Sequence, residues 1–380
     1  MKEQKQSDSP IFCNNIMMEI FSWVPVKSLT QFKCVSKSLN SLISNPYFVK
    51  LHLERSNSKD NFDHLKILPR DEFRDFGEFY NTSCSVRSFL DHPLPPTTRN
   101  FLLAIDNVDK YNLIGSCNGL HCVLSDSAIY LWNMATRVRS SIPCFESTSE
   151  KATCRWGFGY DGLSDTYKVV VIVLYGDDDV EEELEVSSEV KVCDMGDNCW
   201  REVEGFPEVE VLGENDGMYL EGRLYWTVIL HSEWVIYSMD LGKEAYMEFL
   251  LPYNFPNDIE PGPTLIVLKE SLCLWHNNYH ISHLWIWQLK ESQDGVSWSP
   301  LVSLSYLTLQ LHPLRFRSII PLHISKNEDL LIISSRVNVD AQWDAFLYNL
   351  RTNHLEHVAI PTLINKFHPM IYVESLVLPR

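Results

Sequence analysis

Long apolar runs, paired cysteine motifs and an excess of basic residues are all missing from this chain of 380 residues. No apolar run reaches the roughly 18 residues of a membrane-spanning helix, so we expect no membrane segment. Residues 1–8 lack the apolar core of a signal peptide, which favours a cytosolic or nuclear protein that is not secreted. The ten cysteines include no Cys-x-x-Cys pair. We therefore expect reduced core cysteines, without a disulfide framework or a zinc site.

Catalytic motifs are missing as well. The chain has no G-x-S-x-G elbow, no Walker lysine and no H-E-x-x-H. One G-x-G-x-x-G pattern runs from Gly157 to Gly162, but residues 167–174 after it are rich in β-branched side chains and predict a strand. A dinucleotide site needs a helix there, because the helix N-terminus binds the pyrophosphate. We interpret the glycines as a tight turn or a close approach of strands, and we predict no cofactor and no catalytic residue.

Three histidines form a candidate metal site. His276, His280 and His283 have the spacing of ligands on one face of a helix. The pair Asn277-Asn278 and the strand-like flanks instead predict a hairpin turn, which separates the three imidazoles. We therefore predict no metal site.

Acidic residues dominate the middle of the chain, whose formal net charge is −18. Between Asp177 and Glu221 there are 17 acidic residues against Lys191 and Arg201. An acidic face repels nucleic acid and favours basic protein partners. We predict that the densest run contacts a target, and its acidic members are Asp177, Asp178, Asp179, Glu181, Glu182, Glu183 and Glu185. The alternative, a solvated loop that only aids solubility, remains open.

Residues 10–55 predict a small set of helices. Asn14 or Asn15 can cap a first helix, which Pro25 ends, and a second helix is predicted from Ser28. A segment of about 40 residues rarely buries enough surface to be stable alone. We therefore expect its apolar face to contact another protein.

Two further caps divide the rest of this segment. Ser36 can cap a third helix. Asn45-Pro46 has the pattern of an N-cap followed by proline at the first helical position, which opens a last amphipathic segment after the three helices.

The spacing of these residues resembles the plant F-box. The matching positions include Glu19-Ile20, Val24-Pro-Val-Lys-Ser-Leu29, Phe32-Lys-Cys-Val-Ser-Lys-Ser38, Ser41-Leu-Ile43, Pro46 and Phe48. The resemblance implies docking onto the Skp-type adaptor of a cullin ubiquitin ligase, without catalysis by the chain. It assigns to the docking surface Ile11, Ile16, Met17, Ile20, Phe21, Val24, Pro25, Leu29, Phe32, Val35, Leu39, Leu42 and Ile43.

From about residue 101 the pattern predicts β-strands almost throughout. A unit recurs in which an apolar strand ends in a polar anchor, followed by a turn and a strand that runs to proline. The anchors are Asn133, Asp194, Asp240, Gln288 and Asn349, which are 61, 46, 48 and 61 residues apart. Four strands repeated at roughly 40 to 50 residues are typical of propeller blades. Five units are visible, and strands near Phe101 and residues 371–377 can close a sixth blade from both chain ends. We predict a small all-α module of three helices followed by a large all-β domain with a six-bladed β-propeller-like fold, and an irregular β-sandwich is the alternative.

Several phrases in this part resemble the plant F-box-associated domain of the type 1, kelch-like kind. They are Gly115-Ser-Cys-Asn-Gly-Leu, Trp132-Asn-Met-Ala-Thr-Arg, Gly157-Phe-Gly-Tyr-Asp, Asp165-Thr-Tyr-Lys-Val-Val, Cys199-Trp-Arg, Tyr225-Trp and Tyr372-Val-Glu-Ser-Leu. The acidic loops and the ending are similar to pollen S-locus F-box proteins, whose implied targets are basic S-locus ribonucleases.

Four parts are therefore expected: a disordered segment 1–9, an F-box 10–55, a connector with the first strands 56–100, and an F-box-associated domain 101–380. The resemblance implies a substrate receptor whose F-box docks the Skp-type adaptor and, through it, a cullin. The β domain then holds a protein target for ubiquitination and degradation. The alternative is a stand-alone propeller that binds a carbohydrate or small ligand and carries a degenerate F-box.

Overall fold

The computed structural model describes residues 11–57, 65–70, 79–86, 98–102, 111–125, 128–145, 152–175, 187–197, 199–253, 255, 262–278, 283–292, 295–305, 318–325, 329–336, 343–358 and 368–379. The segment predicted to be disordered, 1–9, and the acidic run 177–185 both lie outside the described residues. Among the helices described, none has the length and the apolar character needed to cross a membrane.

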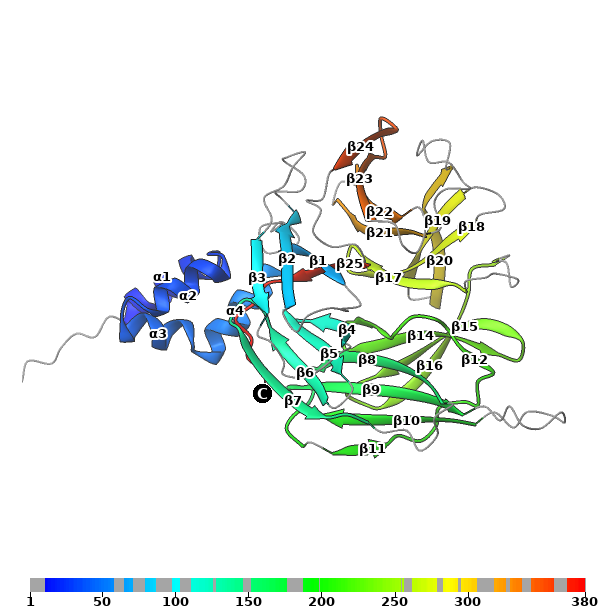
Figure 1. Cartoon of the computed structure of the whole chain (residues 1–380), viewed down its shortest axis with the longest axis horizontal. Helices are drawn as coiled ribbons and strands as arrows, with labels where there is room; N and C mark the ends of the chain where they lie inside the picture. The colour runs from blue at the N-terminus through cyan, green and yellow to red at the C-terminus, as the bar shows by residue number, and fades with distance from the viewer. Residues whose placement is uncertain are drawn as a thin grey trace, which may run out of the picture.

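The described N-terminal residues form a module of four helices (Figure 1), here called the helical module: α1 (Ile11–Phe21), α2 (Val26–Lys33), α3 (Lys37–Ile43) and α4 (Pro46–Ser56). This is one helix more than predicted, because the segment after Asn45-Pro46 is itself a helix of 11 residues. The predicted caps of α3 and α4 are confirmed. The Leu39 N–H donates to Ser36 Oγ at 3.1 Å, and the Tyr47 N–H donates to Asn45 Oδ1 at 2.8 Å. Each side chain thus satisfies a backbone donor that the helix itself leaves unpaired.

The predicted starts of α1 and α2 are wrong. α1 begins at Ile11, before the two asparagines. α2 begins at Val26, with Pro25 as an N-cap that makes no side-chain hydrogen bond. The carbonyl of Pro25 already accepts the N–H groups of Ser28 and Leu29, at 3.0 and 3.1 Å, so the helix starts two residues before Ser28.

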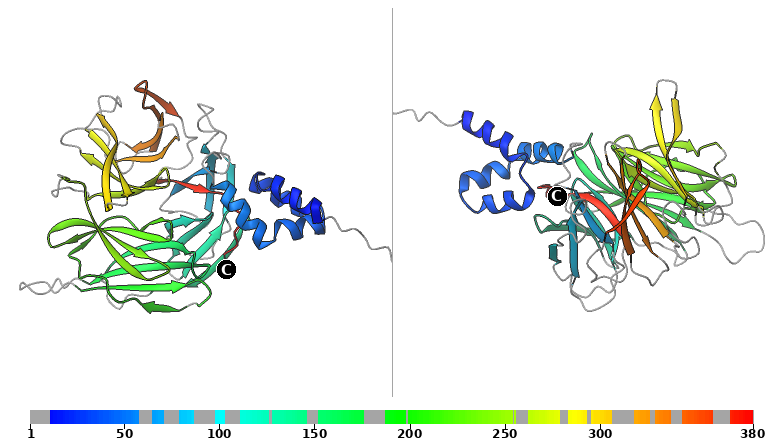
Figure 2. Two further views of the ribbon diagram at one scale, coloured as in Figure 1. Left: turned by 180° about the vertical axis from the view of Figure 1, so that it is seen from behind. Right: turned by 90° about the horizontal axis from the view of Figure 1, so that it is seen from above.

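The described strands form six sheets, of which five are built from consecutive strands (Figures 1 and 2). Sheet 1 contains β4 (Tyr111–Cys117), β5 (Leu120–Ser125), β6 (Ala128–Asn133) and β7 (Val138–Pro143). Sheet 2 contains β8 (Thr153–Asp161), β9 (Thr166–Tyr175), β10 (Ser187–Asp194) and β11 (Trp200–Glu202). Sheet 3 contains β12 (Val211–Leu212), β13 (Met218–Leu220), β14 (Arg223–Leu230), β15 (Glu233–Asp240) and β16 (Ala245–Leu250). Sheet 4 contains β17 (Thr264–Leu268), β18 (Ser271–Asn278), β19 (His283–Ser292) and β20 (Gly295–Ser305). Sheet 5 contains β21 (Ser318–Ile324), β22 (Leu330–Arg336), β23 (Trp343–Asn349) and β24 (His354–Val358).

The sixth sheet joins the two ends of the β domain and is here called the closing sheet. Its order is β25-β1-β2-β3, with β1 (Leu65–Arg70), β2 (Phe79–Ser85), β3 (Thr98–Leu102) and β25 (His368–Val373). β25 pairs antiparallel with β1 from Leu65 opposite Val373 to Arg70 opposite His368. Closure by strands from both chain ends is therefore confirmed. The partner of β25 is a strand of the predicted connector, whereas Phe101 lies in β3, farther from β25 in the same sheet.

Apolar cores lie between neighbouring sheets, which is the packing of a propeller and not of a two-sheet sandwich. One core joins sheets 1 and 2, and further cores join sheets 2 and 3, sheets 3 and 4, and sheets 4 and 5. Fully or almost fully buried members of these four cores are Phe158, Val170, Ile236 and Ile286. The predicted all-β, propeller-like domain is confirmed.

The polar anchors of the repeat end the third strand of four sheets. Asn133, Asp240 and Asn349 each accept, through Oδ1, the backbone N–H groups of the residues two and three positions later. The short side chain thereby stabilises the hairpin turn that follows the strand. Gln288 differs, because it lies inside β19, which continues to Ser292.

Candidate functional site

The helical module presents apolar side chains to solvent. Ile16 and Ile20, four residues apart on α1, are 50% and 58% exposed, and Val35 after α2 is 71% exposed. Two aromatic side chains, Trp23 and Tyr47, are exposed as well. Residues at i and i+4 share one face of a helix, so α1 carries an apolar stripe that the chain itself leaves uncovered. Exposed apolar surface of this kind is typical of a protein–protein interface.

Beneath this surface lies a small core of Val26, Leu29, Ile43 and Phe48, none of which has exposed area. Leu29 and Ile43, which the resemblance places on the docking surface, therefore cannot touch a partner in this conformation. They face inward because α2, α3 and α4 pack their apolar sides against one another. Their part is to support the surface from beneath.

The remaining predicted docking residues differ in how exposed they are. Pro25 is exposed, and the Ile11 side chain lies outside the described residues. The half-buried members are Met17, Phe21, Val24, Phe32, Leu39 and Leu42, of which all but Met17 pack against the module's core. The rings of Phe21 and Phe32 lie 5.6 Å apart between centroids, so the structure does bring α1 and α2 together.

Trp23 is an exposed residue that helical spacing misses, because it lies in the turn after α1. The Arg55 guanidinium carbon is 4.6 Å from the centroid of its ring, and Arg55 also donates to Glu19 Oε1 at 2.6 Å. One turn earlier on α4, His52 Nε2 lies 3.0 Å from Val24 O. These contacts set the position of α4 against α1 and the turn between α1 and α2. The signal that points to Trp23 is a large aromatic residue two positions before Pro25, where the first helix is expected to end.

The C-terminal segment 374–379 continues from β25 to the helical module, where the red end of the chain lies beside α4 (Figures 1 and 2). Leu376 is 1% exposed and belongs to the core of the module, together with Leu29 and Phe48. Ala135, in the turn between β6 and β7, packs against the same core. The module and the propeller therefore share apolar residues from two parts of the β domain.

Hydrogen bonds hold this C-terminal segment on sheet 1. Asn133 Nδ2 donates to Ser375 O at 3.0 Å and to Val377 O at 2.6 Å. Ser375 Oγ donates to Asn118 O at 2.6 Å. Gly119 has a φ of +80°, and a Cβ there would lie 2.8 Å from Val373 O, so both its conformation and the close approach of the segment require glycine.

One ion pair also bridges the module and the propeller. Lys50 Nζ of α4 lies 2.9 Å from Asp165 Oδ2, in the turn between β8 and β9. Both side chains are 60% exposed, so the pair is well solvated. Exposed pairs contribute little to stability, and the apolar contacts at Leu376 are the stronger link.

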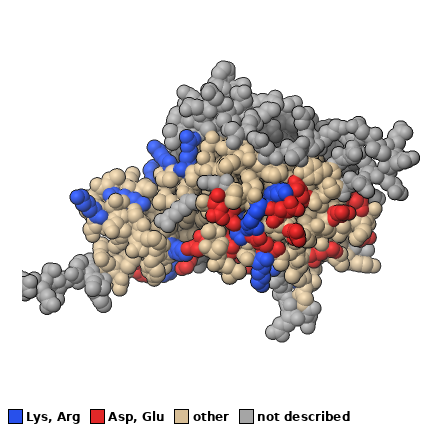
Figure 3. Space-filling model, turned by 90° about the horizontal axis from the view of Figure 1, so that it is seen from below, with Lys and Arg blue, Asp and Glu red and all other residues tan. Residues whose placement is uncertain are grey.

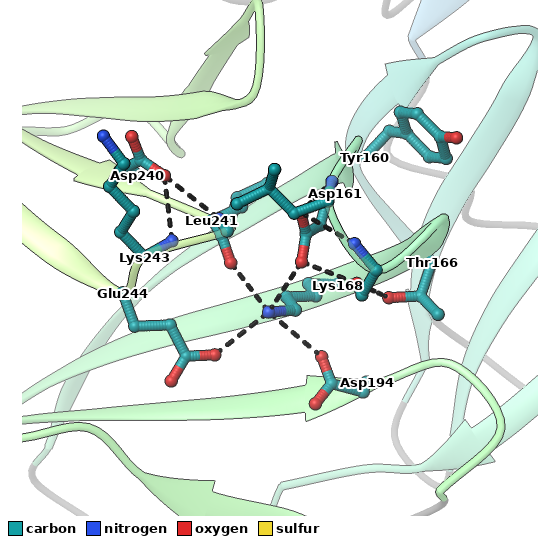
Figure 4. A network of polar contacts seen from close by, with 12 residues as sticks. Tyr160, Asp161, Thr166, Lys168, Asp194, Asp240, Leu241, Lys243 and Glu244 are labelled. Carbon is teal, nitrogen blue, oxygen red and sulfur yellow. Dashed lines mark hydrogen bonds and ion pairs between the residues drawn. The ribbon is translucent and has the colours of Figure 1, made fainter.

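A buried lysine joins sheets 2 and 3 (Figure 4). Lys168 Nζ lies 3.1 Å from Asp161 Oδ2, 3.0 Å from Glu244 Oε1 and 3.6 Å from Asp194 Oδ1, and it donates to Leu241 O at 2.7 Å. The lysine side chain is 7% exposed. Lys168 belongs to the phrase Asp165-Thr-Tyr-Lys-Val-Val quoted above, and its role in this phrase is a structural contact between two sheets.

The charges of this network oppose the cost of burial. Burial lowers the pKa of Lys168, but hydrogen bonds to Glu244 and Asp161 and the charge of Asp194 raise it above the ordinary value of lysine. The pKa of Glu244 is lowered, first by its hydrogen bonds from Arg201 and then by Lys168. The ammonium is thus held charged inside the protein, which suits an ion-pair junction rather than a proton-transferring group.

Gly157 and Gly159 of the G-x-G-x-x-G pattern lie in β8, Gly162 lies in the turn after it, and the strand β9 follows. A Cβ on Gly157 would lie 2.7 Å from Trp226 Cζ2 in β14. The interpretation as a close approach of strands is confirmed. No helix N-terminus follows the pattern at which a pyrophosphate could bind.

The histidine triplet lies on a hairpin. His276 is in β18 and His283 is in β19, where it pairs with Asn278, while His280 lies outside the described residues. The predicted hairpin is confirmed. Within the described ranges, no group of three or more His, Cys, Asp or Glu side chains is placed to hold a metal ion.

Figure 3 shows the charge on one face of the molecule. Acidic side chains gather on the propeller with a few basic ones among them, whereas mainly basic side chains appear on the helical module. In the described part of the acidic region between Asp177 and Glu221, the exposed acidic residues include Glu202, Glu204, Glu208, Glu210 and Glu214. The predicted target-binding residues 177–185 lie outside the described residues.

Comparisons with known proteins agree with this architecture. The family described as F-box associated beta propeller domain matches residues 74–378, and the F-box domain matches residues 11–51. An F-box/kelch-repeat protein of Arabidopsis thaliana is 29% identical over 322 residues, which cover 79% of this chain and 81% of that protein. The F-box protein CPR1 of the same plant is 26% identical, with 96% of this chain and 88% of that protein covered.

Solved structures resemble the chain only distantly. An oligogalacturonate lyase in complex with manganese covers 77% of this chain and 78% of its own, at 8% identity and a TM-score of 0.44. A likeness this low carries no inference about activity or metal binding.

Proposed function

Because the chain belongs to the F-box proteins that carry an F-box associated β-propeller domain, we propose that it is the substrate-recognition subunit of a Skp/cullin/F-box ubiquitin ligase. The helical module docks a Skp-type adaptor, which links it to a cullin in the cytosol or nucleus. The propeller binds a protein target, which is then ubiquitinated and degraded. The chain itself supplies proximity and no chemistry, because a held target meets the ubiquitin-charged enzyme at a high effective concentration.

The observation that carries this proposal is the uncovered apolar surface of the helical module. Ile16, Ile20 and Val35 are each at least half exposed, although the core beneath them is fully buried. Burial of such side chains in a partner stabilises a complex by about 25 cal/mol for each Å² of apolar area. The adaptor is therefore expected to cover the α1 stripe and the turn between α2 and α3.

The test removes two side chains of the stripe together, by Ile16→Ala and Ile20→Ala. Each is expected to contribute about 2 kcal/mol, so the double variant should bind the adaptor about a thousandfold more weakly. Titration calorimetry with purified adaptor measures the Kd. Leu163→Ala is the matched control, since Leu163 is a 77% exposed apolar residue on the propeller. Equal Kd values for the wild type and the double variant would contradict the docking surface.

For the target, we propose a basic protein, and an S-locus ribonuclease is the candidate that the sequence resemblance suggests. The net charge of −18 and the acidic groups on the propeller support this choice. Exposed charges act mainly by steering, and salt screens them beyond about 8 Å at physiological strength. The acidic run Asp177–Glu185 is expected to speed association.

Replacing the acids of this run with Asn and Gln tests the steering role. Association with a basic S-locus ribonuclease should slow at low salt, and the salt dependence of the rate should flatten, while adaptor binding stays unchanged. Stopped-flow rates at low and high salt provide the measurement. Equal rates with equal salt slopes would assign the run to a solvated loop.

A pull-down from plant extract separates this function from a stand-alone propeller. Recovery of adaptor and cullin supports the ligase subunit. A chain that recovers neither, but binds a carbohydrate or small ligand, supports the alternative.

A further inference from the structure

We propose that the C-terminal segment 374–379 holds the helical module in its docking-competent fold, so that adaptor binding depends on a closed propeller. The inference rests on the proposed function and adds a coupling between its two halves. The segment acts by positioning, because it supports α2, α3 and α4 from the side of the propeller.

The first step is that Leu376 completes the core of the module. It is 1% exposed and packs in one cluster with Leu29, Ile43 and Phe48, which have no exposed area. Removal of this side chain leaves a cavity between the helices and the propeller, which destabilises the packing of the module. The docking residues on the outer surface depend on these helices for their positions.

The second step is that the segment is firmly attached to sheet 1. The Asn133 amide donates to the carbonyl groups of Ser375 and Val377, on either side of Leu376. Ser375 Oγ also donates to Asn118 O. These bonds set the backbone of the segment, so Leu376 is presented to the module at a fixed place.

The third step is that the closing sheet positions the start of the segment. Val373 ends β25 opposite Leu65 of β1, only three residues before Leu376. The Tyr372 ring packs edge-on against His121 of β5, with 4.5 Å between ring centroids. If β25 leaves the closing sheet, Leu376 is displaced from the helical module as well. Closure of the propeller and order in the module are therefore linked equilibria, and the linkage acts in both directions.

Leu376→Ala tests the coupling, with Leu378→Ala as the matched control in the same segment. Leu378 is 40% exposed and lies outside the module's core. Hydrogen exchange of residues 26–53 without adaptor is expected to accelerate by about a hundredfold in Leu376→Ala. The control should match the wild type. Exchange in β8–β10 and β14–β15 should stay unchanged, which shows that the propeller remains folded.

Adaptor affinity and its reciprocal effect supply a second readout. The Kd should rise by at least about tenfold in Leu376→Ala, since only the ordered fraction of the module binds. Adaptor should also slow exchange in β25 of the wild type, and this effect should vanish in Leu376→Ala. Unchanged exchange in residues 26–53 of a folded Leu376→Ala chain would overturn the proposal.

Asn133→Ala keeps the test decisive if Leu376→Ala fails to fold. It removes two hydrogen bonds to the segment and the two that Asn133 Oδ1 accepts in the turn after β6, but it removes no apolar side chain of the core. Exchange in residues 26–53 should therefore accelerate by about tenfold. Wild-type exchange in that variant would also overturn the coupling. A wild-type chain that does not bind adaptor would contradict the proposed function instead, and the exchange measurements would still judge the coupling.

Discussion

The helical module and the propeller differ in how far each satisfies its own side chains. The propeller buries apolar residues between every consecutive pair of its first five sheets, and it pairs its buried Lys168 with three carboxylates. The helical module leaves Ile16, Ile20 and Val35 exposed and takes Leu376 from the far end of the chain. The propeller is thus packed mainly between its own sheets, whereas the module completes its core with Leu376 and Ala135 of the β domain.

The phrases that identify the family belong to the propeller. Asn118 of the first phrase donates to the Tyr167 hydroxyl of another, and Lys168 of that phrase pairs with Asp161 of a third. Asn133 and Ser375, from two more phrases, hold the C-terminal segment. Because these residues bond to one another, they are expected to maintain the architecture. Choice of target is expected to depend on other surfaces.

The comparison is tested most strongly at Lys168. Lys168→Met leaves Asp161 buried without its cation, while Glu244 keeps Arg201, and this should destabilise the propeller by about 3 to 5 kcal/mol. Urea unfolding followed by tryptophan fluorescence measures the loss. Lys191→Met is the matched control, because Lys191 pairs with Glu189 and Glu202 on the same sheet but lies closer to solvent. A loss no larger than that of the control would show that the buried network adds little.

A medium effect is expected at His121, where the propeller closes. Burial lowers the pKa of His121 from 6.5 to about 3. Neither ring nitrogen has a hydrogen-bond partner among the described residues. As the pH falls, His121 is therefore protonated in the unfolded chain before it is protonated in the folded chain. Above pH 6.5 this difference does not lower the free energy of unfolding, and between pH 6.5 and pH 3 the free energy of unfolding decreases. At pH 5 the loss should reach about 2 kcal/mol.

His121→Phe removes the proton site and keeps a ring against Tyr372. The difference in unfolding free energy between pH 7 and pH 5 should shrink by about 2 kcal/mol relative to the wild type. His354→Phe, a change at an exposed histidine of β24, serves as the control. If both variants keep the wild-type pH dependence, His121 does not contribute to acid sensitivity at the closing sheet.

The smallest effect is expected at the ion pair between the two regions. A double-mutant cycle with Lys50→Ala and Asp165→Asn should give a coupling below about 1 kcal/mol, because both groups are well solvated. Asn tolerates the positive φ of 57° at position 165. The cycle also cancels the separate hydrogen bond from the Tyr160 hydroxyl to Asp165. A coupling of 2 kcal/mol or more would make charge, and not Leu376, the main link.

Local patterns predicted much of this fold, because their causes lie within a few residues. Ser36 and Asn45 cap helices through bonds to residues two or three positions away. The anchors Asn133, Asp240 and Asn349 recur because each stabilises the turn directly after it. The strands near Phe101 and residues 371–377 were predicted for the same reason, because the pattern of each is complete within one strand.

The candidate site was predicted less well, because the contacts that form it join residues that are distant in sequence. Helical spacing shows that Leu29 and Ile43 are apolar, but not that each faces a core completed by Leu376. The exposed Ile16 and Ile20 have the same spacing signal as buried residues. Lys168 is likewise visible as part of a phrase, while its partner Glu244 lies in another sheet.

The pairing of β25 with β1 also determines when the closing sheet can form during translation. Leu65 and Val373 are roughly 300 residues apart, and a ribosome adds about 5 to 20 residues per second. The N-terminal helices and β1 therefore wait roughly 15 to 60 s during translation before their last partners are synthesised. During this interval the core of the helical module lacks Leu376, so its apolar residues are less covered than in the folded chain. Chaperones that meet the chain on the ribosome are expected to bind there.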